Sequence, residues 1–361
     1  MKATEKLHDL GQSVWLDNIT RKLLSSRTLR TYIDDLSVTG LTSNPTIFDQ
    51  AISRSSDYDD DIRRKVSEGK SGEDLFFELA LDDLRQAADL FRPIHDRTLG
   101  VDGWVSLEVS PLLAHDTQGT IEAARKLHVQ ANKPNLLIKI PGTREGLPAI
   151  EESIFSGIPI NVTLLFSRQQ YEAAADAYMR GIERRIKDGL SPYVASVASL
   201  FISRWDVAVA DKVPDTLKNK LGIAIAKQTY AAYRAFLGSP RWQRAFNFGA
   251  RPQRLLWAST GTKDPRAPDT LYLSSLAAPF TVNTMPEKSL HALADHGQID
   301  DMLPNEGGDS IGVLEKFAAA GINVDTLAAQ LQHEGEKSFE KSWNDLMGVI
   351  GTKSAALKQA S

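Results

Sequence analysis

The chain reads IPINVTLLF at 158–166, RQQYEAAADAYMRGIERRIKDG at 168–189 and YVASVAS at 193–199. The two outer segments are short and apolar, which is typical of buried strands, and the longer middle segment has a helical pattern. A strand, a helix and a second strand in this order form the repeating unit of a parallel sheet with crossover helices. This stretch therefore predicts an α/β fold.

The same alternation extends over most of the chain. Six further apolar segments predict strands and bring the total to eight: QSVWLD (12–17), SVTGLTS (37–43), WVSLEVS (104–110), LLIKI (136–140), RLLWAST (254–260) and FTVNTM (280–285). Between two of them, GTIEAARKLHVQANK (119–133) again has a helical pattern. Eight strands, each followed by a helix, can close into a barrel that has no exposed edge. We therefore predict a single (β/α)8 TIM-type barrel.

An open, doubly wound sheet is the alternative fold. Such a sheet would normally carry a glycine-rich phosphate turn after an early strand. Neither GxGxxG nor GxxxxGK[ST] occurs in the chain. The absence of both motifs favours the barrel.

Two regions are too long to be simple crossovers. Residues 49–103, between the second and third strands, predict two or three inserted helices, and the segments near 287–297, 309–321 and 324–350 predict a helical C-terminal tail. We expect residues 1–351 to form one domain and the small, polar residues 352–361 to form a flexible tail.

Composition excludes several classes of function. Lys and Arg number 42 and Asp and Glu 46, so the formal net charge is −4 and gives no general attraction to nucleic acid or to an anionic membrane. The chain has no cysteine, which excludes disulfides, thiolate metal sites and a cysteine nucleophile. Its seven histidines show no HExxH-like pairing, so we expect no metal site.

The N-terminal sequence MKATEKLHDLGQSVW lacks the apolar core of a secretory signal. No segment approaches the about 18 consecutive apolar residues of a transmembrane helix. We therefore expect a soluble, cytoplasmic enzyme.

Lys139 lies within the predicted strand LLIKI, between aliphatic residues. Both faces of a strand in a parallel barrel are buried, and burial of an unpaired ammonium favours loss of its proton. A neutral lysine amine is a nucleophile for carbonyl carbon. The alternative is a lysine at the strand end whose ammonium reaches solvent. Pro141 and Gly142 indicate that the strand ends near Lys139, so this alternative stays open.

Asn161 and Thr163 lie two positions apart in the fifth predicted strand, so both side chains project to the same face. An asparagine can cap a strand end and threonine is a good strand former. An amide and a hydroxyl that share one face of an otherwise aliphatic strand, however, suggest a polar partner inside the barrel.

Three more polar residues follow earlier strands. Asp17 ends the first strand, Asn44 follows the second and Glu108 lies near the end of the third. Each could instead cap a helix or form a turn, Asn44 before Pro45 above all. Together with Lys139 and the fifth-strand pair, they place polar side chains at the carboxyl ends of five consecutive strands, where barrel enzymes carry their active sites.

The later strands predict a phosphate pocket. SVASLFISR (196–204) supplies Ser199, Phe201 and Arg204, and ASTGTKDP (258–265) supplies Ser259 and Lys263. Hydroxyls, backbone N–H groups of small residues and two cations can together bind an oxyanion. The alternative is that both cations simply face solvent on loops.

These motifs resemble a known family. TSNPTIF, SLEVSP and LLIKIPGT, followed by REGLPAIEESIFSGIPINVTLLFS, closely resemble the transaldolase family of the pentose phosphate pathway. The resemblance covers most of residues 11–350 and is densest at 36–48 and 104–168. It implies an enzyme without metal or organic cofactor that moves a dihydroxyacetone unit from sedoheptulose 7-phosphate or fructose 6-phosphate to an aldose phosphate, either glyceraldehyde 3-phosphate or erythrose 4-phosphate.

The resemblance also implies roles for the residues singled out above. Lys139 matches the Schiff-base lysine, Glu108 and Thr163 the groups that move protons during imine formation and release, and Asp17 the base that acts on the C4 hydroxyl. The residues that match substrate or phosphate contacts are Asn44, Asn161, Ser199, Phe201, Arg204 and Ser259.

The chain departs from better-known relatives after the seventh strand. Those relatives carry an arginine where Gly261 stands, and Lys263 is the nearest cation here. We therefore assign phosphate binding to Lys263. The family further implies small sugar phosphates as partners, a monomer or homodimer, and a functional association with phosphoglucose isomerase.

Two other functions fit part of this pattern. A fructose 6-phosphate aldolase is a smaller relative that releases free dihydroxyacetone. The resemblance implies for it a shorter chain, with glutamine at the position of Glu108 and tyrosine at that of Phe201. A phosphosugar-binding or partner module without catalysis, such as half of a fused assembly with phosphoglucose isomerase, would have no use for a buried Lys139 together with Asp17 and Glu108. The 361-residue length and these side chains favour transaldolase.

Overall fold

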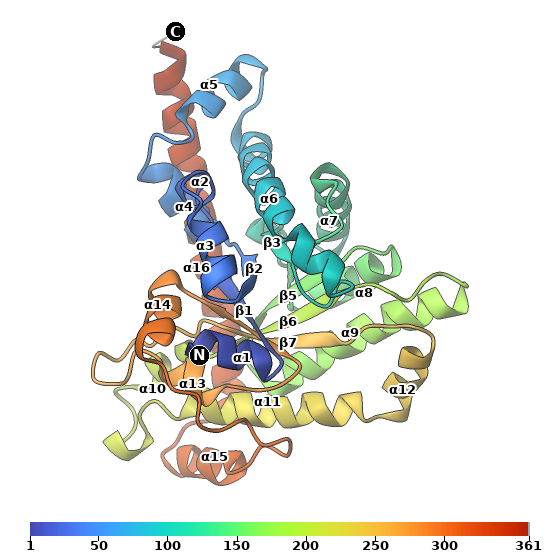
Figure 1. Cartoon of the computed structure of the whole chain (residues 1–361), viewed down its shortest axis with the longest axis vertical. Coiled ribbons are helices and arrows are strands. Elements are labelled where there is room, and N and C mark those ends of the chain that lie inside the picture. The colour runs from blue at the N-terminus through green and yellow to red at the C-terminus, as the bar shows by residue number, and fades with distance from the viewer. Residues whose placement is uncertain (360–361) are drawn as a thin grey trace.

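A computed structural model of the chain describes residues 1–359. Its centre is a closed barrel of eight parallel strands in sequential order (Figure 1), and the predicted (β/α)8 fold is thereby confirmed. The strands are β1 (Gln12–Asp17), β2 (Val38–Thr42), β3 (Val105–Glu108), β4 (Leu136–Pro141), β5 (Ile160–Leu165), β6 (Ser196–Phe201), β7 (Gln253–Ala258) and β8 (Thr281–Met285).

Helices surround the barrel. They are α1 (Ala3–Asp9), α2 (Arg21–Ser25), α3 (Thr28–Asp35), α4 (Pro45–Ser53), α5 (Asp59–Ser67), α6 (Gly72–Arg97), α7 (Thr117–Ala131), α8 (Gly146–Phe155), α9 (Arg168–Lys187), α10 (Ser203–Val209), α11 (Leu221–Leu237), α12 (Pro240–Asn247), α13 (Leu271–Ser275), α14 (Glu287–His296), α15 (Ser310–Ala319) and α16 (Val324–Gln359), with 3-10 turns at Pro111–Leu113 and Asp215–Leu217.

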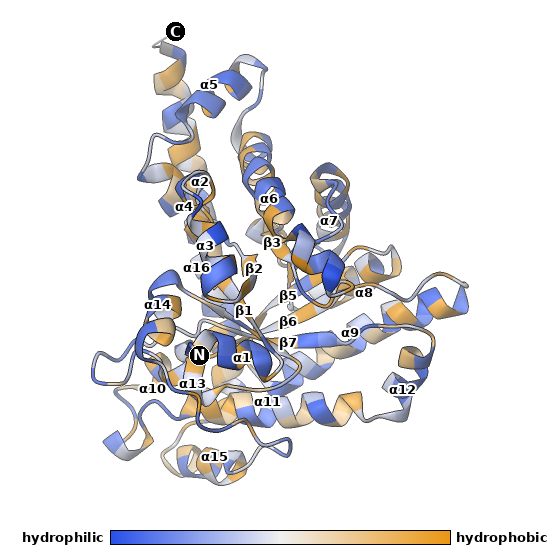
Figure 2. Ribbon diagram, viewed as in Figure 1, coloured by the Kyte–Doolittle hydropathy of each residue, from blue (hydrophilic) through white to orange (hydrophobic). Residues whose placement is uncertain are grey.

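Local sequence explains where the long helices begin and how they face. Helix α9 begins with a capping box in which Ser167 accepts from the backbone N–H of Gln170, whose side chain reaches back to the residue before the helix. Apolar and polar bands alternate along α9 and α11 (Figure 2), which fits helices that bury one side. Within residues 1–359, none of the helices combines the length and the apolar character needed to cross a bilayer.

Strand boundaries differ from the prediction mainly at β6. This strand begins at Ser196 rather than at 193 and continues through Phe201. Tyr193 instead turns outward, where its ring packs 5.0 Å from the Arg251 guanidinium. Strand β7 ends at Ala258 because Ser259 adopts a left-handed backbone conformation with φ of 56°.

Three helices, α4 to α6, fill the long region between β2 and β3 and confirm the predicted insertion. A buried polar cluster joins the α5–α6 part of this insertion to α2. Arg21 contacts Asp83 of α6 at 3.0 Å, and the Tyr58 hydroxyl donates to the same carboxylate at 2.7 Å.

Helix α16 is the longest element, with 36 residues. It packs along α4 and α5, and its C-terminal part extends away from the barrel (Figure 1). The predicted tail at 352–361 is helical up to Gln359, and residues 360–361 lie outside the described part. Its flexibility and the 1–351 domain boundary stay predictions.

Candidate active site

A cavity of about 300 Å³ opens at the carboxyl ends of the strands. It is lined by side chains from β1, β2, β4 to β8, α4 and α16. Nine of the predicted site residues line it: Asp17, Asn44, Lys139, Thr163, Ser199, Phe201, Arg204, Ser259 and Lys263. The remaining two, Glu108 and Asn161, are buried beside that lining.

Strand register brings Glu108, Lys139 and Asn161 side by side, because β4 pairs Lys139 with Glu108 on β3 and with Asn161 on β5. Lys139 is 5% exposed, so the alternative of an ammonium in solvent is wrong. Its Nζ lies 2.9 Å from Glu108 Oε2 and donates to the Ser43 carbonyl at 3.3 Å. The sequence argument assumed an unpaired amine, whereas the structure pairs it with a carboxylate.

Burial raises the pKa of Glu108, and the Lys139 charge opposes this rise. A carboxylate with a raised pKa is a stronger base for protons that must pass to and from an amine. The Thr163 hydroxyl oxygen is buried without a hydrogen-bond partner. Thr163 lines the cavity, so this hydroxyl is available to a molecule bound there.

Asp17 lies at the end of β1 and is held by a chain of hydroxyls. Thr42 donates to Asp17 Oδ1 at 2.8 Å, and Thr284 lies 2.7 Å from the Thr42 hydroxyl. Burial raises the pKa of Asp17, while Lys139, the Thr42 hydrogen bond and Lys263 each act to lower it. The carboxylate is therefore a base whose strength its neighbours adjust.

Amides and hydroxyls line the middle of the barrel. The Asn161 amide donates to Ser106 at 3.0 Å and accepts from Ser199 at 2.7 Å. Asn44 caps α4 by accepting from the backbone N–H of Ile47 at 3.0 Å, as the alternative interpretation held, and it also lines the cavity. The cap fixes the Asn44 side chain at the cavity wall.

The predicted phosphate residues gather at one part of the cavity. Arg204 lies with its guanidinium 5.3 Å from the Phe201 ring, and burial lowers its pKa. The hydroxyls of Ser203 and Ser259 are 2.9 Å apart. Gly261 and Lys263 complete this side of the lining. Both predicted cations thus line the same cavity, Arg204 half-buried on α10 and Lys263 exposed on the loop after β7.

The lining residues that sequence reasoning missed include Thr42, Thr284 and Phe339. Thr42 lies two positions before Asn44 at the end of a strand, and that parity could have indicated it. Phe339 comes from α16, and its ring lies 5.5 Å from Lys139 Nζ. No local pattern distinguishes Phe339 from the other apolar residues of a long helix.

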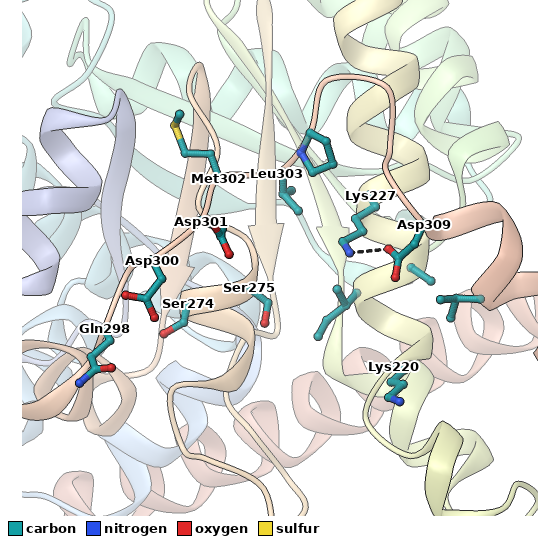
Figure 3. A pocket seen from close by; sticks show the side chains of 14 residues that line it. Lys220, Lys227, Ser274, Ser275, Gln298, Asp300, Asp301, Met302, Leu303 and Asp309 are labelled. Carbon is teal, nitrogen blue, oxygen red and sulfur yellow. Dashed lines mark hydrogen bonds and ion pairs between the residues drawn. The ribbon is translucent and has the colours of Figure 1, made fainter.

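A second cavity, of about 510 Å³, lies outside the barrel between α11, α13 and the segment around residue 300. Among its lining side chains, Lys227 and Asp309 form an ion pair at 2.6 Å (Figure 3). It contains none of the predicted site residues and no buried nucleophile. The smaller cavity at the barrel mouth is therefore the candidate active site.

Within residues 1–359, no group of three or more His, Asp or Glu side chains is arranged to hold a metal ion. The cavity polar groups are a lysine, carboxylates, hydroxyls and amides. Such groups suit a carbonyl substrate with hydroxyls and an anionic end.

Comparison with known proteins identifies the family of the chain. The family model described as transaldolase/fructose-6-phosphate aldolase matches residues 14–350. The transaldolase of Saccharopolyspora erythraea is 44% identical over 353 residues, which cover 96% of both chains. The transaldolase of Acidothermus cellulolyticus is 45% identical over 354 residues, covering 96% of this chain and 95% of its own. The transaldolase of Thiobacillus denitrificans is 43% identical over 359 residues, covering 97% of this chain and all of its own. The chain therefore belongs to the transaldolase/fructose-6-phosphate aldolase family.

Proposed function

We propose that Lys139 is the Schiff-base lysine of this enzyme and that Glu108, Thr163 and Asp17 move the protons of its reaction. The enzyme is a transaldolase, a transferase of the pentose phosphate pathway. It transfers a dihydroxyacetone unit from sedoheptulose 7-phosphate or fructose 6-phosphate to an aldose phosphate, glyceraldehyde 3-phosphate or erythrose 4-phosphate.

The first step is imine formation. The Lys139 amine adds to the C2 carbonyl of the ketose, and the resulting carbinolamine loses water to give an iminium. Protons must reach the departing oxygen and leave the nitrogen. Glu108, 2.9 Å from the lysine Nζ, is placed to exchange them, and the Thr163 hydroxyl assists.

The second step breaks the C3–C4 bond. Asp17 removes the proton of the C4 hydroxyl, the aldose phosphate leaves as an aldehyde, and the bonding electrons pass to C3 as an enamine. The iminium accepts these electrons more readily than a ketone would. In the reverse direction, C3 attacks the acceptor aldehyde and Asp17 returns the proton to the new alkoxide.

Substrate orientation is assigned to the remaining lining. Asn44, Asn161 and Ser199 bind the hydroxyls of the donor, and Phe201 packs against its carbon chain. Arg204, Ser259 and Lys263 bind the phosphate, with Lys263 in place of the arginine that relatives carry at Gly261.

One observation carries this proposal: a lysine that is 5% exposed lies 2.9 Å from one carboxylate and shares a cavity with a second. Glu108 and Phe201 also favour transfer over the aldolase activity that the same family includes. We further propose that the enzyme acts in the cytoplasm as a monomer or homodimer, alongside phosphoglucose isomerase. The absence of cysteine fits a reducing compartment.

Borohydride trapping tests the proposal. The protein is incubated with fructose 6-phosphate, reduced with borohydride and digested, and the peptide masses are measured. A three-carbon adduct on the peptide that contains Lys139 is expected. Addition of erythrose 4-phosphate before reduction should deplete the adduct and produce sedoheptulose 7-phosphate. No adduct on that peptide would contradict the assignment, and an adduct without sedoheptulose 7-phosphate would indicate an aldolase.

A further inference from the structure

We propose that Phe339 of α16 is a specificity-determining residue that keeps bulk water from the three-carbon enamine on Lys139. The unit then persists until an aldose acceptor arrives. This inference rests on the proposed Schiff-base function and concerns the choice between transfer and release.

Phe339 is the part of the C-terminal helix that reaches the nucleophile. Its ring centroid lies 5.5 Å from Lys139 Nζ, it lines the cavity and it is 5% exposed. A three-carbon unit bonded to Nζ lies within reach of this ring. An apolar ring at that distance excludes water that would otherwise solvate the enamine.

Contacts on both sides of Phe339 hold the helix over the barrel. The Gln332 side chain donates to the carbonyls of Leu164 at 2.9 Å and Gly142 at 3.2 Å. Leu164 directly follows Thr163 in β5, and Gly142 directly follows the end of β4, the strand of Lys139. Further along α16, the Ser342 hydroxyl lies 2.7 Å from that of Thr46 on α4. Phe339 lies between these two anchors, so its ring has little freedom to leave the cavity.

Close approach of the helix depends on a glycine. A Cβ added at Gly335 would lie 2.9 Å from a Leu164 methyl carbon and 3.4 Å from an Arg204 nitrogen. One residue further, Glu336 is 6% exposed and contacts His115 of the β3–α7 loop at 3.2 Å. The helix is therefore fitted to the ends of β5 and α10 and fastened to the loop beyond Glu108.

The enamine has two fates once the aldose has left. In transfer, C3 attacks the acceptor aldehyde, a C–C bond forms and Asp17 protonates the alkoxide. In release, C3 takes a proton from water, water adds to the C2=N bond, and breakage of the C2–N bond gives free dihydroxyacetone and the lysine amine. Product release after transfer also needs water, and Glu108 with Thr163 serve that step. Phe339 acts between departure of the first aldose and arrival of the acceptor. In that interval, protonation of C3 by bulk water would lead to release of free dihydroxyacetone.

The test measures the ratio of free dihydroxyacetone to sedoheptulose 7-phosphate formed from fructose 6-phosphate and erythrose 4-phosphate. We expect Phe339→Ala to raise this ratio about tenfold, because the cavity beside Nζ then fills with water. Phe339→Leu keeps an apolar side chain and should raise it less. The three-carbon adduct should still form in both variants.

Trp343→Leu is the matched control on the same helix. Trp343 is buried one turn further along, with its ring 5.1 Å from Phe76 and 5.7 Å from Phe77, and it does not line the cavity. This change should lower the melting temperature and leave the ratio unchanged.

An equal rise in Trp343→Leu would overturn the proposal, since loosening of α16 would then suffice. An unchanged ratio in a Phe339→Ala protein that still forms the adduct would also overturn it. If Phe339→Ala does not fold, Phe339→Leu decides in the same way. Absence of the adduct from the unaltered enzyme would instead overturn the proposed function, and this inference with it.

Discussion

Lys139 Nζ and Glu108 Oε2 lie 2.9 Å apart, and both side chains are almost completely buried. The two residues come from adjacent strands and are paired in register. A proton can pass between them without rearrangement of the backbone. The pairing also means that replacement of either residue changes the charge balance felt by the other.

Lys139→Ala should abolish turnover and leave the barrel folded. Loss of a covalent nucleophile typically costs more than about 1,000-fold in kcat. Sedoheptulose 7-phosphate formation is the measurement, and the circular dichroism spectrum reports the fold. If a folded Lys139→Ala variant lost less than about 1,000-fold in kcat, Lys139 would not be the nucleophile.

The same variant should have a pH-dependent stability. Burial already raises the pKa of Glu108 and Lys139 opposes the rise, so loss of the lysine raises the pKa further. A carboxyl group whose folded pKa lies above its unfolded value contributes stability at low pH and loses it as pH rises through the folded pKa. Urea unfolding of Lys139→Ala should therefore show stability that declines from acid toward neutral pH, relative to the unaltered protein. Adding Glu108→Gln should remove most of that decline, and an unchanged decline would place its origin elsewhere.

Glu108→Gln should slow imine formation by about 10²- to 10⁴-fold, because the amide keeps the shape of the carboxylate and cannot exchange the proton. The rate of borohydride-trapped adduct formation measures the step. The variant should also shift toward aldolase behaviour, with more free dihydroxyacetone per transfer. Glu145→Gln, in the loop after β4, removes an equal charge outside the cavity and should have no effect. Equal trapping rates in the two variants would contradict the assigned role.

Thr42→Val should move the acid limb of the pH–activity profile to higher pH. The Thr42 hydroxyl donates to Asp17 at 2.8 Å and lowers the pKa of that carboxyl, so its loss raises the pKa. Asp17 must be ionised to accept the C4 hydroxyl proton. In the Thr42→Val variant, a smaller fraction of Asp17 is ionised at a given low pH. The measurement is kcat/KM as a function of pH. Thr39→Val, on the same strand but bonded to the Val14 carbonyl at 3.4 Å, should leave the limb in place.

Lys263→Ala should raise KM for sugar phosphates by about tenfold or more, since a hydrogen bond to a charged group contributes about 1.5–3 kcal/mol. Competitive inhibition by inorganic phosphate should weaken in parallel. Arg266→Ala is the charge-matched control, because Arg266 lies on the same loop, exposed and paired with Asp264 at 3.2 Å.

A second change can restore the phosphate contact. Gly261→Arg in the Lys263→Ala background places a cation where relatives carry one. A Cβ at Gly261 would meet Pro286 at 3.3 Å, so a small adjustment of that proline is needed. Partial recovery of KM is expected. Equal effects of Lys263→Ala and Arg266→Ala would mean that only general charge matters.

Most of the site could be predicted from the sequence because, in a parallel barrel, the position of a residue along its strand determines at which end of the barrel it lies. Asp17, Asn44 and Glu108 lie at or just beyond the ends of their strands, and Lys139 and Thr163 lie two residues before the ends of β4 and β5. Parallel strands of similar length bring such residues to one end of the barrel. The sequence places the start of β6 too early because tyrosine, the residue type at position 193, is common in strands. Packing of the Tyr193 ring against Arg251 takes this residue out of the sheet.

The sequence alone determined the eight strands, the insertion, the helical tail and the residues at the strand ends, since hydrophobic periodicity and local order express these directly. Tertiary structure decided what surrounds the lysine. The Glu108 carboxylate is its partner because two strands pair in one register, and Phe339 covers it because α16 returns across the barrel mouth. Both contacts join segments far apart in the chain, and their existence depends on packing distances that no local pattern encodes.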